Sequence, residues 1–249
     1  MNVEIRIPNQ ASIHSLGNFL GGNQFFATGA SRFELVFHPR FVYLQPFALS
    51  MLAAWGDYWT KQGVPIICRN ISASGVDYAW RMGLFSILRI DHKPAREEHE
   101  EAGRFLPLRR ITEPKDVSDF LADIAPLLHR PEHIHAVQYC LSETIRNVLE
   151  HAGGAPAFCC AQFYKEAQRV SIGVADYGIG IFGSLSKYYP VKTASAAIRE
   201  ALKPGVTGAP RGAYGTPDNA GAGLFFLKCI AKSSRSYLAL GVCPSNRFC

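Results

Sequence analysis

The feature that most constrains the fold is a helical segment between Glu132 and His151, whose apolar and polar residues separate onto two faces. A helical residue advances by about 100°, so one side of the axis gathers five aliphatic residues: Ile134, Val137, Leu141, Ile145 and Val148. The opposite side carries Glu143, Asn147 and His151 at positions i, i+4 and i+8. The apolar face has to be buried against another layer, so the segment predicts a layered α/β structure.

The polar face of this helix admits two interpretations. Most such faces are only solvated surface, and that reading applies to any amphipathic helix taken alone. Asn147 favours a chemical role, because asparagine is a weak helix former whose amide competes for backbone hydrogen bonds. Its neutral oxygen suits Mg²⁺, which prefers oxygen ligands. Glu143, one turn earlier, could polarise a water or hydroxyl for attack on a γ-phosphate, and Glu150 is the alternative base.

A first glycine motif, Asp176-Tyr-Gly178-Ile-Gly180, follows an apolar strand expected over residues 170–176. A carboxylate at this point can accept a hydrogen bond from an exocyclic amine such as that of adenine. The two glycines let the backbone approach a ring without a Cβ in the way. Taken alone, such a string is more often a plain turn than a site.

A second glycine motif, Gly221-Ala-Gly223-Leu224, opens into an apolar helix expected over residues 224–232. The start of a helix offers free N–H groups and the positive end of the dipole, which suit a phosphate tail. The preceding stretch, residues 203–220, is rich in glycine and proline. We interpret it as a lid that covers the phosphates.

In chain order these three patterns resemble the N box and the two glycine boxes of the GHKL (Bergerat-fold) ATPases. The matching residues are Glu143-x-x-x-Asn147-x-x-x-His151, Asp176-x-Gly178-x-Gly180 and Gly221-x-Gly223-Leu224. The resemblance extends over roughly residues 116–242. It implies ATP and Mg²⁺ as cofactors and a Bergerat ATP-binding fold for the C-terminal part.

The resemblance also implies a role for each residue. On the helix, Asn147 is the expected Mg²⁺ ligand, Glu143 the expected general base, and His151 part of the ATP-binding motif. The remaining expected contacts to ATP are Asp176 at the adenine, Gly178 and Gly180 around the adenine pocket, and Gly221, Gly223 and Leu224 at the phosphates.

The first half of the chain alternates strands with helices. Strands are expected over residues 33–37 and 64–68, and helices over residues 47–59 and 76–88. This βαβα order is weakly similar to a STAS domain, the usual substrate and partner of the anti-sigma-factor serine kinases. A phosphorylatable STAS domain carries Asp-Ser before its first long helix, where this chain has Leu44-Gln45-Pro46. Self-phosphorylation at that position is therefore not expected.

We expect an α/β fold, an α+β two-layer sandwich with two domains. Residues 1–110 would form the STAS-like α/β domain with a charged connector, and residues 111–249 the ATP-binding domain. A strand or linker is expected over residues 105–111. The second domain would contain helices over residues 116–129, 131–151, 193–202 and 224–232, and strands over residues 158–164, 170–176 and 237–242. The family normally adds strands beyond this point, so either the fold is abbreviated or its C-terminus is missing.

Composition excludes several classes of protein. The net charge of +6 is spread along the chain, so we expect no nucleic-acid binding. No stretch approaches the length of a membrane span or of a secretion signal, which predicts a cytoplasmic protein without a membrane partner. The seven cysteines form no C-x-x-C pair, which argues against a disulfide framework and a zinc site.

Three functions remain open. The first is a bacterial serine-kinase-like regulatory switch that transfers the γ-phosphate of ATP or hydrolyses it. The alternative is a non-catalytic, ATP-gated interaction module that controls a partner protein, and a homodimer is also possible. The third is a protein similar to a sensor histidine kinase, but His129 is followed at once by Arg130-Pro131, which indicates a helix end rather than a phosphoacceptor helix.

Overall fold

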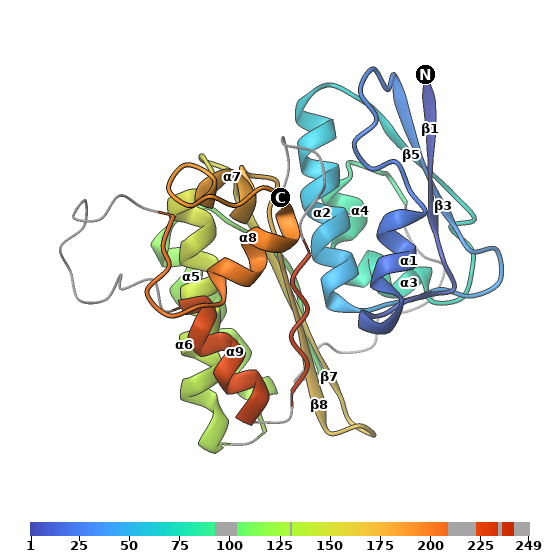
Figure 1. Cartoon of the computed structure of the whole chain (residues 1–249). Helices are drawn as coiled ribbons and strands as arrows, with labels where there is room; N and C mark the ends of the chain where they lie inside the picture. Colours follow the sequence, from blue (N-terminus) through green and yellow to red (C-terminus); the bar gives the residue numbers. More distant parts are fainter. Residues whose placement is uncertain (93–103, 130, 209–222, 234–235, 242–249) are drawn as a thin grey trace. The chain divides into compact units, whose positions relative to one another are not determined.

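The computed structural model describes residues 1–92, 104–129, 131–208, 223–233 and 236–241 (Figure 1). The chain forms two compact units. The first consists of Met1–Arg110 with Phe158–Ala175, and the second contains the described parts of Ile111–Ala157 and Asp176–Cys249. The mixed α/β class expected from the sequence is confirmed. The division into domains 1–110 and 111–249 stays a prediction.

A parallel sheet begins the first unit. Its strands are β1 (Asn2–Ile7), β3 (Arg32–Phe37) and β5 (Ile66–Arg69), in the order β1-β3-β5. Along β1 exposed and buried residues alternate, with Val3, Ile5 and Ile7 on the buried face. This period of two marks a sheet with one face toward the core. Two short strands, β2 (Gln10–Ala11) and β4 (Tyr43–Leu44), form a separate parallel pair.

Helix α2 (Pro46–Lys61) is the central helix of the first unit. It starts with a proline in the first turn, where the missing N–H costs nothing. Most of its residues are buried, and the indole N–H groups of Trp55 and Trp59 donate to the Phe25 carbonyl at 2.7 and 2.9 Å. The sequence-based helix over residues 47–59 is therefore confirmed.

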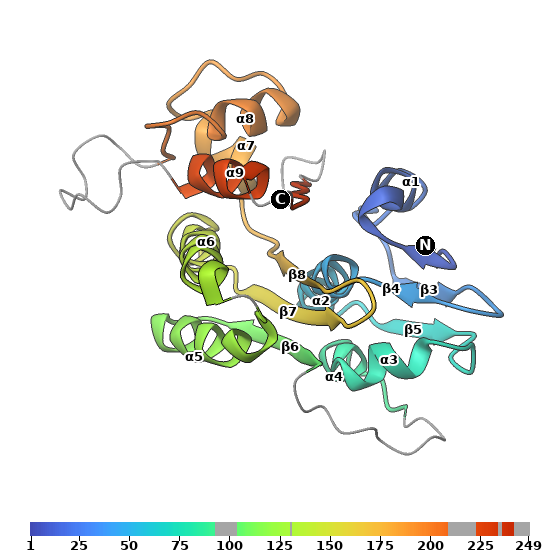
Figure 2. The same cartoon turned by 90° about the horizontal axis from the view of Figure 1, so that it is seen from below.

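Helix α2 also packs on a second sheet of the first unit, next to β8 (Figure 2). This sheet contains β6 (Phe105–Ile111), β7 (Ala157–Tyr164) and β8 (Arg169–Ala175) in that order, with β7 and β8 antiparallel. The approach is close, because a Cβ on Gly173 would lie 2.2 Å from the Pro46 carbonyl oxygen. Strands at the positions of β6, β7 and β8 were predicted.

The remaining helices of the first unit are short. They are η1 (Ile13–Ser15), α1 (Leu16–Gly21), α3 (Val76–Arg81) and α4 (Leu84–Ile87). The single helix expected over residues 76–88 is wrong, because Gly83 adopts a left-handed φ of 84° and divides it. Neither η1 nor α1 was expected.

The second unit contains α5 (Pro114–Ile124), η2 (Ala125–Leu127), α6 (Pro131–His151), α7 (Gly180–Leu185), α8 (Ala194–Ala201) and α9 (Gly223–Ser233). Helix α6 packs against α5 and α9, and α7 packs against α8. Leu141, Ile145 and Val148 are buried, so the predicted apolar face of α6 is confirmed for these positions.

Two further sequence-based expectations have an outcome. The strand expected over residues 237–242 is not observed in residues 236–241, which form neither helix nor strand, and Val242 lies outside the described residues. Tyr237 in this stretch is 72% exposed. Within the described ranges, no helix combines the length and the apolar character needed to cross a bilayer.

Candidate functional site

Helix α6 carries the predicted polar stripe. Glu143 and Asn147 are half-buried in its middle, and His151, also half-buried, is its last residue. The buried aliphatic residues occupy the other face of the helix. The predicted separation of the two faces is thus present, and it leaves the amide of Asn147 partly accessible.

The first glycine motif lies against the C-terminal end of α6. A Cβ on Gly178 would stand 2.3 Å from both the Cβ and the carbonyl oxygen of Ala152, the residue after His151. A Cβ on Gly153 would contact the Ile179 side chain at 3.7 Å. Glycine is therefore required at position 178 for close packing on the helix end, a reason that the sequence did not reveal. Gly180 begins α7 with a φ of 65°.

Asp176 directly follows β8 and turns back onto this motif. Its Oδ1 accepts a hydrogen bond of 2.7 Å from the Gly178 N–H. Burial raises the pKa of Asp176 to about 6, although the Gly178 hydrogen bond acts in the opposite direction. A carboxyl group with a pKa raised by its surroundings is more typical of a functional site than of a surface.

The second glycine motif meets the same helix further toward its N-terminus. A Cβ on Gly223, the first residue of α9, would lie 3.0 Å from Glu143 Oε2 and 3.2 Å from Glu143 Cβ. Beyond it, the rings of Tyr139 and Phe226 pack edge to face, with centroids 6.3 Å apart. The start of α9 is therefore placed beside the predicted base.

The rest of the second motif is described only in part. Leu224 is half-buried in the first turn of α9. Gly221 and the lid residues 209–220 lie outside the described residues, so their predicted roles remain predictions.

The two glycine contacts bracket Asn147 along α6. Glu143, which meets Gly223, and Ala152, which meets Gly178, are nine residues apart in the chain. This corresponds to about 13 Å of helix at 1.5 Å per residue. Asn147 lies about halfway along this span.

An arginine beside the predicted bases was missed by the sequence analysis. Arg146 Nη1 lies 3.8 Å from Glu143 Oε1, and Arg146 Nη2 lies 3.4 Å from Glu150 Oε1. Glu150 Oε2 lies 3.9 Å from His151 Nε2. The i+3 and i+4 spacings along the helix could have indicated these pairs. They are partly exposed and add little to stability.

The donor set limits how a metal could bind. No group of three His, Cys, Asp or Glu side chains that could hold a metal exists in the described part of the chain. Mg²⁺ keeps several waters and binds largely through the phosphates of its nucleotide, so one amide oxygen is a sufficient protein ligand. The residues present therefore fit Mg²⁺ only when it arrives with phosphate.

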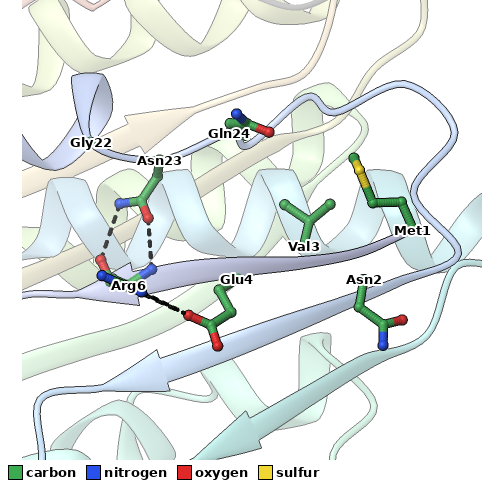
Figure 3. A pocket seen from close by; sticks show the side chains of 8 residues that line it. All are labelled: Met1, Asn2, Val3, Glu4, Arg6, Gly22, Asn23 and Gln24. Atoms are coloured by element: carbon green, nitrogen blue, oxygen red, sulfur yellow. Dashed lines mark hydrogen bonds and ion pairs between the residues drawn. The ribbon is translucent and has the colours of Figure 1, made fainter.

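A pocket of about 290 Å³ lies in the first unit, and none of the predicted site residues lines it (Figure 3). Its lining consists of Met1, Asn2, Val3, Glu4, Arg6, Gly22, Asn23 and Gln24.

Comparison of the chain with protein-family models, with curated proteins and with solved structures gives no match.

Proposed function

We propose that the second unit binds ATP with Mg²⁺ in the manner of the GHKL ATPases. One observation carries the proposal: Gly223 lies against Glu143 of the helix that bears Asn147, and Gly178, from a motif far apart in the sequence, lies against Ala152, the residue that follows this helix. The contact at Gly178 is too close for any side chain at that position, and the contact at Gly223 is tight.

Each residue then has a physical task. Asp176 accepts a hydrogen bond from the adenine amine with an oxygen that Gly178 does not use. The free N–H groups at the start of α9, from Gly223 and Leu224, bind phosphate oxygens. Asn147 holds Mg²⁺, which neutralises charge on the triphosphate when it is bound.

The proposed activity is that of a serine-kinase-like regulatory switch, which transfers the γ-phosphate to a partner protein or to water. Glu143 acts as the base, since its carboxylate lies beside the start of α9. The proposed partner is a protein, in keeping with the STAS-like interpretation of residues 1–110, and the proposed location is the cytoplasm, where ATP is available. His129 lies between η2 and α6, outside both, which gives no support to a histidine-kinase role.

The ion pair with Arg146 favours a second candidate, an ATP-gated module without turnover. Arg146 Nη1 lies 3.8 Å from Glu143 Oε1 and competes with water or a hydroxyl for that oxygen. Incubation of the purified protein and a cell lysate with γ-labelled ATP separates the two candidates. Labelled protein or released phosphate supports the switch, whereas bound but unconverted ATP supports the gated module.

Asn147→Ala tests the binding proposal. The substitution removes the only side-chain oxygen assigned to Mg²⁺, so we expect Mg²⁺-dependent ATP binding to fall at least tenfold, as loss of a hydrogen-bonding group to a charged ligand predicts. The fold should be kept, because alanine is the better helix former. Calorimetry measures the affinity and circular dichroism the fold. Wild-type affinity in the folded variant would remove Asn147 from the site.

A further inference from the structure

The pocket of the first unit borders the free edge of β1. In the sheet order β1-β3-β5, β3 pairs with one side of β1, and no described strand pairs with the other. Main-chain groups of a strand point alternately to its two sides. The main chain of Arg6 points away from β3, because Arg6 N donates to Asn23 Oδ1 at 2.6 Å and Asn23 Nδ2 donates to Arg6 O at 3.0 Å (Figure 3). The same alternation turns the main chains of Asn2 and Glu4 to this edge.

The amide of Asn23 pairs with Arg6 as the peptide group of a neighbouring strand would. It is held in place, since Nδ2 also donates to the Phe19 carbonyl at 2.9 Å. This side chain therefore shows which chemistry the edge accepts, one donor and one acceptor spaced as in a peptide. The Asn23 amide pairs with the main chain of only one β1 residue, Arg6.

The pocket begins where the Asn23 amide ends. Met1 and the β1 residues Asn2, Val3, Glu4 and Arg6 line it on one side, and residues 22–24 line it on the other. Its volume of about 290 Å³ is sufficient for a few residues of extended chain. Unpaired edge groups beside a groove are the arrangement used in β-strand addition.

We propose that this pocket binds an extended peptide segment of a partner protein, which pairs with Asn2 and Glu4 of β1 as an added strand. A second copy of the chain is a poorer occupant, because the Asn23 amide leaves only two residues of edge. Such a contact is far below the roughly 1,000 Å² that a stable interface between two folded proteins needs.

The side chains around the edge define the sequence of the peptide. A peptide residue opposite Glu4 has its side chain on the same face of the sheet as the Glu4 side chain. The Glu4 side chain is 41% exposed and forms ion pairs with Arg6 and Arg69 at 3.1 and 3.3 Å. These charged groups form a polar, solvent-exposed surface, so a long polar residue fits there better than an apolar one. Its neighbours turn to the face of Val3, which is buried and apolar, so they should be aliphatic.

The probe is acetyl-Val-Lys-Val-Lys-Val-amide, titrated into the full chain and followed by amide hydrogen exchange. The amide of Glu4 should become protected, whereas those of Val3 and Ile5, which bond to β3, should not change. Glu4→Pro removes the outward N–H together with the Glu4 carboxylate, at a position where an edge strand tolerates proline, and should weaken binding about tenfold. Glu4→Ala keeps the N–H and is the matched control, with a loss of no more than about threefold.

Two results would overturn the proposal: a folded Glu4→Pro variant that binds the peptide as the Glu4→Ala variant does, or absence of binding at millimolar peptide. If Glu4→Pro does not fold, N-methylated peptides give the answer on the wild-type chain. Methyl groups on the peptide nitrogens that face β1 should abolish binding, and those on the other edge should not. Equal binding of both peptides would exclude strand addition.

Discussion

The surroundings of Asp176 raise the pKa of its carboxyl group to about 6 from the usual 3.8, because burial disfavours the charged form. Between these two values the folded state binds more protons than the unfolded state. The contribution of Asp176 to stability therefore falls as the pH rises from about 4 to about 6, and stays unfavourable above that range. A charge kept at a cost to stability is what a binding site for an amine donor would need.

Asp176→Asn should reverse this cost. The amide keeps an acceptor for the Gly178 N–H but carries no charge, so the variant should be more stable than the wild type at pH 7, by at most about 3 kcal/mol. The difference should vanish near pH 4. Urea unfolding from pH 4 to pH 8 measures it. Asp119→Asn, at an exposed ion pair with Lys115, is the control, with a change within about 0.5 kcal/mol at all pH values. A destabilised Asp176→Asn variant at pH 7 would contradict the account.

Candidate site residues could be chosen from the sequence by their type and position, but the contacts that they make in the folded chain could not be predicted. Asn147 could be selected because asparagine is unusual inside a helix, and Asp176 because its motif follows that helix in the order of the resembled family. The ion pair of Arg146 with Glu143 could not be ranked, because any charged helix offers similar spacings. The close contact of Gly178 with Ala152 depends on a loop folding back, which no local pattern encodes.

Glycines with positive φ precede two helices of the first unit, α3 and α4. Gly75 precedes α3 with a φ of 90°, and Gly83 precedes α4 with a φ of 84°. The two helices were predicted as one over residues 76–88, because a single glycine inside a helical pattern is tolerated. The two positions differ in space: a Cβ at Gly75 would lie 2.0 Å from the Val42 carbonyl oxygen, whereas a Cβ at Gly83 would meet nothing within 4 Å.

Alanine at these two positions separates backbone strain from steric conflict. Gly83→Ala adds only the left-handed φ and should cost about 1 kcal/mol of unfolding free energy. Gly75→Ala adds the conflict with Val42 and should cost clearly more, about 3 kcal/mol. Chemical denaturation of both variants beside the wild type gives the two values. Equal losses would show that the Val42 contact relaxes freely, contrary to the close packing inferred here.

At the scale of elements, length decided what could be predicted. Helices α2 and α6 and strands β7 and β8 are long enough for a hydrophobic period to be recognised. Helices α1 and α7 have six residues each, too few for a period, and were missed. Residues 237–241 have the composition of a strand but no regular structure, because a strand needs a partner as well as a pattern.

The composition of the two compact units is a property of the whole molecule. Strands β7 and β8 belong with Met1–Arg110 through contacts such as that of Cys160 Sγ with the Pro46 carbonyl, at 3.3 Å and 114 positions apart in the chain. Periodicity reports on neighbours in sequence, so it could predict the strands but not the helix that covers them. The mixed α/β class could be predicted because it depends only on the order of elements.

The central claim is that Gly178, Asn147 and Gly223 surround one site for ATP with Mg²⁺. Isothermal titration of the full chain with ATP, in Mg²⁺ and then in excess EDTA, tests it most directly, with GTP as the matched ligand. The account predicts saturable binding of one ATP, at least tenfold weaker without Mg²⁺, and much weaker binding of GTP, whose carbonyl would face the Asp176 carboxylate. No binding of ATP, or equal binding of ATP and GTP, would contradict it.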